Sequence, residues 1–235
     1  MTRSITRLRP ASGAARCTIL GLLLIAWLAP APVRAACTDS PQAGVDWSGC
    51  EKRRLVIRKA DFRNARFTGA DMGRTDLASA NLAGSDLSRA SVDHARFSSA
   101  DLSRAKLVQL NGYRANFSSA KLVGADFSKA ELARANFSLA DFSGAKLEKA
   151  DLHRAVLQGA NLTGANLTGA DLARANLVKA SLGRATLAQA DLTLTRLEGT
   201  DLTAALGLTQ PQLGAACGDD GTKLPKGLTR PAGWP

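Results

Sequence analysis

A five-residue repeat runs through most of this chain of 235 residues without a frame shift. Every fifth residue from Ala60 to Ala205 except Leu110 is small, with 25 Ala among 30 positions. The residue two places further on is Leu, Phe, Met or Val at 28 of 29 positions from Phe62 to Leu202. A period of five fits neither the 3.6-residue period of an α-helix nor the two-residue period of a flat strand. The pattern therefore predicts a solenoid, in which each unit packs against the next copy of itself.

One repeat, such as residues 160–164 (Ala-Asn-Leu-Thr-Gly), indicates which side chains face inward. One small and one large apolar side chain can fill the interior without a void, while the remaining polar residues are turn formers. If four repeats close one coil, residues 20 apart stack about 4.8 Å from each other. Residues 55–205 would then build about seven coils, a rod on the order of 35 Å long.

Three stretches of the repeat carry a resemblance to a known family: Ala100-Asp101-Leu102, Ala160-Asn161-Leu162 and Ala170-Asp171-Leu172. In tandem, they resemble the pentapeptide-repeat family, and the resemblance extends over about residues 55–205. It implies an all-β fold, a right-handed quadrilateral β-helix. The family shares no common catalytic activity, so the resemblance implies no active site. The segment 208–218 also resembles the C-terminal segment of exported bacterial members.

The first 35 residues differ from the repeat. An apolar run, residues 17–29, is followed by Pro30, Pro32 and the small-residue site 33–35, and four arginines precede it: Arg3, Arg7, Arg9 and Arg16. This order predicts a secretory signal peptide, residues 1–35, cleaved before Ala36, and hence a periplasmic or secreted protein. A retained membrane anchor is the alternative, which the short apolar run disfavours.

Removal of residues 1–35 changes the charge balance. They hold five Arg and no acidic residue, so 31 basic residues become 26 against 20 acidic ones, and the net charge falls from +11 to +6. A mildly basic mature chain gives little reason to expect nucleic acid as a ligand. Some cytosolic members of the resembled family mimic DNA and bind type II topoisomerases through a strongly acidic surface, which an exported basic chain does not match.

Both ends of a solenoid need closing, because they would otherwise expose apolar side chains and unpaired edges. We expect an N-terminal cap over residues 36–54, around Trp47. At the other end, residues 206–235, Thr209 and Gln212 match a capping box that predicts a short helix of about residues 210–217. The tail from Pro225 to Pro235 is expected to extend along the surface.

Three cysteines remain after processing. Cys37 and Cys50 are close enough in the chain to form a local disulfide in an oxidising compartment. Cys217 is then left over, and we favour a buried small hydrophobe over a reactive or intermolecular thiol. The two histidines of the chain, His94 and His153, are interpreted as surface residues, so we expect no catalytic residue, no metal and no cofactor.

If residues 20 apart stack, the sequence shows which side chains form each column on the predicted surface. One column is almost entirely basic: Arg54, Arg74, His94, Arg114, Arg134, Arg154 and Arg174. With Tyr113 it is a possible surface for a polyanion or a partner. Acidic residues precede four of the arginines by three positions (Asp71, Glu131, Asp151 and Asp171), and a second column alternates in sign (Arg66, Asp86, Lys106, Asp126 and Lys146). We therefore favour a self-neutralised face, stabilised by charge pairs, over a ligand-binding stripe.

One repeat, residues 110–114, exchanges the two inward residue types, with Leu110 at the small position and Gly112 at the large one. We favour a volume exchange over a kink that displays Tyr113, because the frame is unbroken on both sides. In the regular repeats, three aromatic residues 20 apart should stack in the core: Phe97, Phe117 and Phe137.

These observations predict an exported, non-enzymatic structural or protein-interaction module with a protein partner. The alternative is a binder of an anionic envelope polymer or of lipid head groups through the arginine column. A DNA mimic that binds topoisomerase is the third hypothesis and requires retention in the cytosol. We expect no nucleic-acid ligand and no membrane span in the mature form.

Overall fold

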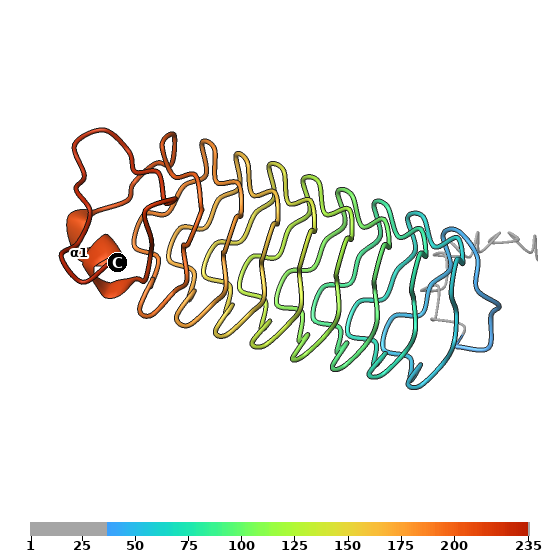
Figure 1. Ribbon diagram of the computed structural model, residues 1–235. Helices are drawn as coiled ribbons and strands as arrows, with labels where there is room; N and C mark the ends of the chain where they lie inside the picture. The colour runs from blue at the N-terminus through green and yellow to red at the C-terminus, as the bar shows by residue number, and fades with distance from the viewer. Residues whose placement is uncertain (1–36, 235) are drawn as a thin grey trace, which may run out of the picture. The chain divides into compact units, whose positions relative to one another are not determined.

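The computed structural model describes residues 37–234, so the predicted signal peptide and its cleavage before Ala36 lie outside the described residues. From residue 46 onward the chain winds into successive coils along one axis (Figure 1). Parallel bridges pair the first repeat residues with the residue 20 further on, from Asp46 and Arg66 to Thr186 and Leu206. Four pentapeptides therefore close one coil, as the repeat predicts.

The solenoid begins earlier than the sequence indicated. One column of eight bridges runs from Asp46 to Leu206, which makes eight coil-to-coil steps of about 4.8 Å rather than about seven coils. Val45, Trp47 and Cys50 are buried in the inward positions of the first coil. The predicted boundary at residue 55 was wrong. Trp47 and Cys50 occupy inward positions at which later repeats have Leu and Ala, so the repeat pattern is not recognisable in the first coil.

The positions of one repeat are named here first to fifth, as in Asp61-Phe62-Arg63-Asn64-Ala65. The fifth N–H donates to the second carbonyl, at 3.0 Å between Ala65 and Phe62, and closes a turn. The second and fourth N–H groups donate to the next coil, with Phe62 bonded to Asn81 at 2.6 Å. A turn every five residues interrupts each extended stretch, so the pairing takes the form of isolated parallel bridges.

In the repeats that begin with Asp or Asn, the third N–H is satisfied by a side chain. Asp or Asn at the first position accepts it: Ser103 N–H donates to Asp101 Oδ1 at 2.9 Å, and Ala83 N–H donates to Asn81 Oδ1 at 3.1 Å. A short side-chain acceptor two residues before an N–H makes an Asx turn. This contact explains why Asp and Asn recur at the first position.

The fourth residue of each repeat is left-handed. Every fourth position from Gly44 to Gly199 has positive φ, and the 22 that are not glycine have φ between 54° and 60°. Because the preceding third residue does not share the positive φ, the turn is of type II. This geometry places the fourth side chain at the corner of the coil, where nearly all such residues are exposed or half-buried.

The core contains the predicted aromatic stack. The ring of Phe117 lies 4.8 Å from Phe97 and 5.0 Å from Phe137, with interplanar angles of 5° and 10°. All three side chains are fully buried. At the N-terminal end, Trp47 packs edge-on against Phe62 and Phe67. The confirmed stack follows directly from a coil of 20 residues.

The exceptions to the small–large pattern are accommodated locally. The hydroxyls of Thr195 and Thr200 at fifth positions each donate to a buried carbonyl at 2.7 Å. Leu110 is buried, and its Cδ2 lies 3.6 Å from the place a Gly112 Cβ would occupy. The volume exchange predicted for this repeat is confirmed, since Leu110 fills the space that Gly112 leaves.

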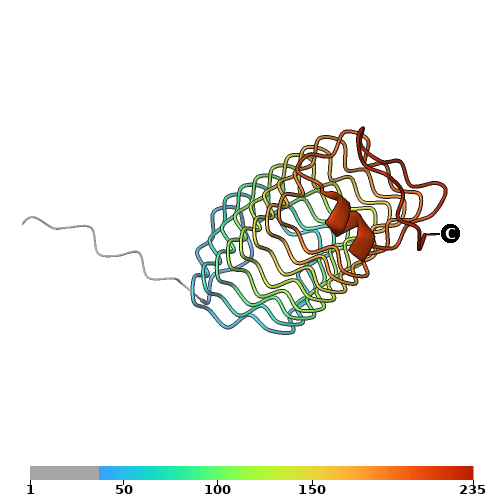
Figure 2. The same ribbon diagram turned by 90° about the vertical axis from the view of Figure 1, so that its left-hand side faces the viewer.

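A short helix, α1 (Gln210–Ala215), covers the C-terminal end of the coils (Figure 2). The predicted capping box is present, and Thr209 N–H donates to Gln212 Oε1 at 2.9 Å. Gln212 Nε2 also donates to the carbonyls of Leu187 and Ala190, at 2.9 Å each. The Ala190 carbonyl, to which no following coil within residues 37–234 donates, thereby gains a partner, and the Leu187 carbonyl accepts this bond in addition to the Ala190 N–H.

The tail was predicted to extend along the surface; most of its residues between Lys226 and Gly233 are exposed, but it ends on a buried indole. Trp234 is only 9% exposed, and its Nε1–H donates to the Ala216 carbonyl at 2.8 Å. Its ring lies over Gly218, where an added Cβ would come within 2.3 Å of it. The indole folds back because it can bury its ring and still satisfy its N–H. Within residues 37–234, we find no helix long and apolar enough to cross a bilayer.

We predict that Phe117→Ala destabilises the protein by about 3–5 kcal/mol, because it opens a cavity between two stacked rings. Phe117→Leu should cost less, since it removes less volume. Denaturant unfolding of both variants measures the difference. An unfolding curve for Phe117→Ala that coincides with that of the parent would contradict the coil geometry.

A second prediction concerns the side-chain cap. Asp101→Ala should lose about 1–2 kcal/mol, because the Ser103 N–H loses its acceptor. Asp101→Asn keeps an acceptor oxygen and should stay within about 0.5 kcal/mol of the parent. Lys121→Ala, one coil further on, is the control, since the structure gives Lys121 no such bond. Equal losses for Asp101→Ala and Lys121→Ala would show that the cap contributes nothing.

Candidate functional site

The basic column of the sequence forms a continuous line in the structure. We call it the arginine ladder, and its members lie 20 residues apart at the fourth position of successive repeats: Arg54, Arg74, His94, Arg114, Arg134, Arg154 and Arg174. All seven are exposed, with φ between 54° and 60°. The coil repeat therefore places one basic side chain on the same corner of each coil, about 4.8 Å from the next.

The charge pairs expected within repeats do not form. Among residues 37–234, no member of the ladder makes an ion pair, although nine ion pairs involve other residues. The expectation that Asp71, Glu131, Asp151 and Asp171 neutralise the column was wrong. The ladder is instead a line of exposed cations.

Turn geometry explains the missing pairs. The carboxylates of Asp151 and Asp171 accept the N–H of His153 at 2.9 Å and of Ala173 at 2.8 Å, so they are held along the flat part of the coil. The arginine three residues on has already turned the corner. Asp71 caps Gly73 in the same way and pairs with Arg53, on the preceding coil, at 3.0 Å.

Charges at the first positions do pair between coils. Arg66 lies 3.7 Å from Asp46, Arg96 lies 3.8 Å from Asp76, and Lys146 lies 4.0 Å from Asp126. The column of alternating sign is thus partly paired, as the sequence indicated. Neutralisation occurs on the flat faces of the rod and does not extend to the corner that carries the ladder.

Hydrogen bonds stabilise several first-position carboxylates in their charged form. The Arg63 guanidinium, which donates to Asp61 at 2.6 Å, lowers the pKa of Asp61 to about 2. A hydrogen bond from the Thr203 hydroxyl, at 2.7 Å, lowers the pKa of Asp201. These carboxylates therefore remain ionised at neutral pH, with their oxygens engaged in local contacts.

Tyr113 lies half-buried beside the middle of the ladder. Its ring is 5.8 Å from that of His94, and the Arg114 guanidinium lies 5.2 Å from its centroid. Its backbone N–H donates to Asp93 Oδ1 at 3.0 Å. The aromatic ring thus lies against two neighbouring members of the ladder.

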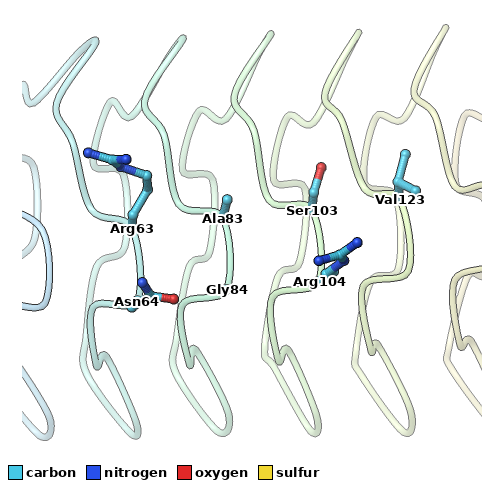
Figure 3. A pocket seen from close by; sticks show the side chains of 7 residues that line it. All are labelled: Arg63, Asn64, Ala83, Gly84, Ser103, Arg104 and Val123. Carbon is cyan, nitrogen blue, oxygen red and sulfur yellow. The ribbon is translucent and has the colours of Figure 1, made fainter.

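A shallow groove lies on a different corner of the rod. It has a volume of about 520 Å³, and Figure 3 shows its lining side chains spread over four successive coils. Small residues form its floor, including Ala83 and Gly84, and Arg63 and Arg104 lie at its sides. Arg63 is engaged by Asp61. The groove is open, and it brings together no pair of catalytic side chains.

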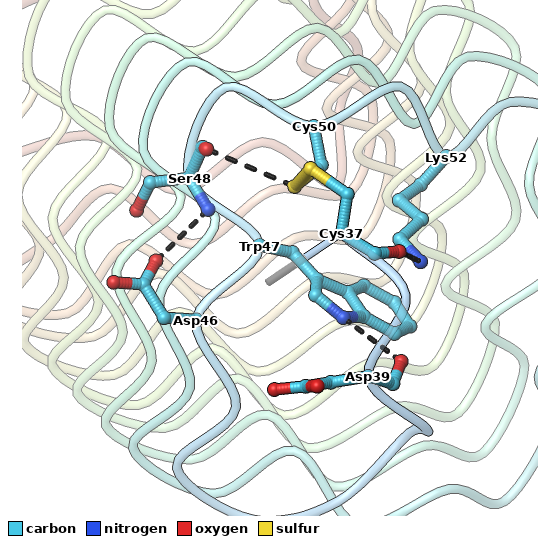
Figure 4. Close-up of a disulfide and its surroundings, with 7 residues drawn as sticks. All are labelled: Cys37, Asp39, Asp46, Trp47, Ser48, Cys50 and Lys52. Carbon is cyan, nitrogen blue, oxygen red and sulfur yellow. Dashed lines mark hydrogen bonds between the residues drawn. A yellow bond between two sulfur atoms is a disulfide. The ribbon is translucent and has the colours of Figure 1, made fainter. Parts of the chain in front are cut away.

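The N-terminal end holds the Cys37–Cys50 disulfide, with a Cα–Cα distance of 5.5 Å (Figure 4). Lys52 Nζ lies 3.8 Å from the centroid of the Trp47 ring and donates to the Cys37 carbonyl at 2.6 Å. Trp47 Nε1–H donates to the Asp39 carbonyl at 3.2 Å. The disulfide thus ties the segment before the first coil across the buried indole.

Cys217 is a free and exposed thiol, so the expectation that it is buried was wrong. It pairs with Arg196, 21 residues earlier, because the frame slips by one residue after α1. The slip places Cys217 at an outward first position instead of an inward one. No signal in the repeat indicates this slip.

The histidines do not belong to a common site. His94 is an exposed member of the ladder, and His153 lies half-buried at a third position, three coils further on. Over the part of the chain that the structure describes, no group of three His, Cys, Asp or Glu side chains could hold a metal ion. We therefore take the ladder as the candidate functional site.

The coils, their turns and their stacked core make this chain a repeat solenoid. The family model described as Pentapeptide repeats matches it in 8 copies, over residues 57–92, 95–134, 113–148, 135–172 and 165–203. These matches extend over more than half of the chain. The protein belongs to the pentapeptide repeat family.

Two solved structures illustrate the likeness. HetL, a pentapeptide repeat protein involved in heterocyst differentiation regulation from the cyanobacterium Nostoc sp. strain PCC 7120, is 30% identical, covering 81% of this chain and 91% of HetL, with a TM-score of 0.37. A trypsin-treated variant of QnrB1, a plasmid-mediated fluoroquinolone resistance protein, is 19% identical, covering 80% of this chain and 88% of QnrB1, with a TM-score of 0.52. The second likeness shows the shared fold. No curated protein sequence matches the chain.

We predict that the ladder does not stabilise the fold. Replacing Arg114, Arg134 and Arg154 together with Gln should leave the free energy of unfolding unchanged or raise it by up to about 1 kcal/mol at low salt, because like charges are removed. High salt should abolish any gain. Thermal and urea unfolding at two salt concentrations measure the effect. A loss of more than about 1 kcal/mol would show that these arginines are paired in solution.

Proposed function

We propose that this protein is an exported, non-enzymatic interaction module, a rigid right-handed, four-sided β-helical rod that contacts its partner through the arginine ladder. The observation that carries this proposal is the line of exposed cations without ion-pair partners in residues 37–234. Charged residues on the surface of a folded domain are usually solvated singly or paired. Six arginines on one straight corner create a directed positive field along the rod.

Rigidity supports this role. The core side chains from Phe62 to Leu202 are almost all buried, and the coils are joined by a continuous backbone hydrogen-bond network. Trp47 and the Cys37–Cys50 disulfide cover one end, and α1 with Trp234 covers the other. A rod of this kind holds the arginines at a constant spacing, so a partner meets a preorganised surface.

Export rests on the sequence of residues 1–35 and is consistent with the disulfide, because disulfides persist in oxidising compartments. A net charge of +6 after processing agrees with a basic contact surface. A DNA mimic would need an acidic surface and retention in the cytosol, so the ladder disfavours that hypothesis.

The ladder also supports the alternative partner considered from the sequence, an anionic envelope polymer or lipid head group. The acidic surface of a protein and an anionic polymer would both complement a line of guanidinium groups. The ladder is the contact surface in either case.

Expression of the full chain in a bacterium tests export. We expect protein from the periplasm or medium to begin at Ala36 and to contain one disulfide, between Cys37 and Cys50. Intact-mass analysis with and without reduction measures both features. Recovery of a full-length, reduced chain from the cytoplasm would overturn export and revive the DNA-mimic hypothesis.

Site-specific crosslinking tests the contact surface. A photo-crosslinking amino acid at position 134 should capture a partner in the exported compartment, and Arg114→Gln with Arg154→Gln should abolish the capture. The same amino acid at position 149, an exposed fourth position on another corner, is the control. Equal capture at positions 134 and 149 would contradict a role for the ladder.

A further inference from the structure

We propose that the arginine ladder binds a single chain of a linear acidic polysaccharide, with the polymer lying parallel to the axis of the rod. This inference rests on the proposed function, since it takes the ladder as the contact surface. The binding tract is the run of four consecutive arginines: Arg114, Arg134, Arg154 and Arg174. The ligand class is a polymer with one carboxylate on each sugar.

Spacing favours this polymer. The ladder is straight and offers one guanidinium about every 4.8 Å. A pyranose ring linked at both ends advances by about one coil spacing, so a uronate polymer along the rod carries about one carboxylate for each coil. An extended acidic peptide advances about 3.3 Å per residue and presents side chains on one face about every 6.6 Å, so neither spacing matches that of the coils. Duplex DNA winds away from a straight edge after a few phosphates.

The width of the basic stripe favours one chain over a membrane. Three residues before the ladder, at the first position of the same repeats, lies an acidic column: Asp71, Glu131, Asp151 and Asp171. Glu131 is exposed and the three aspartates are half-buried. A flat anionic bilayer would meet this column as well as the ladder and would be repelled by it. A single polymer chain can contact the ladder alone.

Hydrogen-bond donors lie on the other side of the ladder. Asn116, Asn136 and Asn176 each follow a ladder arginine by two residues and are half-buried. Their Oδ1 atoms are engaged: Asn136 Oδ1 accepts the Ser138 N–H at 3.0 Å, and Asn116 and Asn176 make the equivalent bond.

These bonds leave the Nδ2 groups of the three asparagines as donors. Within residues 37–234, the structure gives those amides no acceptor, whereas Asn161 Nδ2 donates to Asp141. A sugar offers hydroxyl and ring oxygens beside its carboxylate. The combination of guanidinium and amide donors on three of the four coils, with Val156 after Arg154 as the exception, therefore fits a hydroxylated carboxylate better than a simple polyanion.

Arginine suits the carboxylates of such a ligand. Its planar guanidinium forms two parallel hydrogen bonds to one carboxylate, which lysine cannot do. The ladder arginines also have no competing ion pair to break. Binding should therefore depend on the arginines themselves as well as on their charge.

Calorimetric titration of the processed protein with polygalacturonate oligomers tests the proposal. At about 0.15 M salt, the triple substitution of Arg114, Arg134 and Arg154 by Gln should weaken binding on the order of a hundredfold, because three counterion-releasing contacts are lost. The matched control replaces Arg89, Lys129 and Lys149 by Gln, which removes the same charge from exposed fourth positions on another corner. The control should weaken binding by less than about fivefold. Equal weakening would overturn the assignment to the ladder.

Replacing the same three arginines with Lys keeps the charge and separates specific recognition from general attraction. We expect these lysines to weaken polygalacturonate binding by about tenfold, since bidentate contacts are lost. If the triple Lys variant bound polygalacturonate as tightly as the parent, the proposed bidentate recognition of carboxylates would be wrong. Unfolding curves of all variants should match the parent, which excludes loss of the fold as the cause.

Competing ligands distinguish the sources of negative charge. Polyglutamate of equal charge, duplex DNA and vesicles of phosphatidylglycerol and phosphatidylcholine should each bind at least about tenfold more weakly than polygalacturonate. Tighter binding of any one of them would overturn the polysaccharide assignment in favour of that class. If no polyanion binds while position 134 still captures a protein, this inference fails and the proposed function stands. If position 134 captures nothing that depends on the ladder, the proposed function fails as well.

Discussion

The structure depends on one constraint: the backbone N–H groups of a five-residue unit that turns a corner need acceptors. The first, second and fourth N–H groups bond to neighbouring coils, and the fifth closes the turn. Only the third is left, and in the repeats that begin with Asp or Asn this side chain accepts it, as Asp101 does for Ser103. A buried or half-buried N–H without an acceptor is costly. Two inward apolar residues and one side-chain acceptor therefore define the repeat, and the remaining positions are free to vary.

This division of roles determines what the surface can carry. The fourth residue must adopt positive φ, which suits glycine, yet 22 of these corners carry other residues at a cost of about 1 kcal/mol or more each. The continuous hydrogen bonding and closed core are strong enough to impose the conformation. Corner side chains then contribute little to folding. A column of arginines can stand at one corner because its side chains are exposed and make no ion pair within residues 37–234.

The inward positions could be predicted from the sequence because they follow a strict period. The aromatic stack of Phe97, Phe117 and Phe137 followed from the coil of 20 residues, and the exchange of Leu110 and Gly112 followed from volume. The first coil was missed because Trp47 and Cys50 replace the usual residue types. The exposure of Cys217 was missed because the frame slips after α1. Such local changes at the ends of a solenoid leave no periodic signal.

The pairing of charges could not be predicted from column positions alone, because it depends on where each turn directs its side chains. Asp151 and Arg154 share a repeat, but the Asx turn holds the carboxylate on the flat face while positive φ directs the arginine from the corner. The same geometry that satisfies the third N–H thus separates the acid from the base. A ladder of like charges has a repulsion that the fold does not relieve, and a polyanion would relieve it on binding. The backbone constraint that defines the repeat is therefore also the physical origin of the unpaired ladder that we propose as the contact surface.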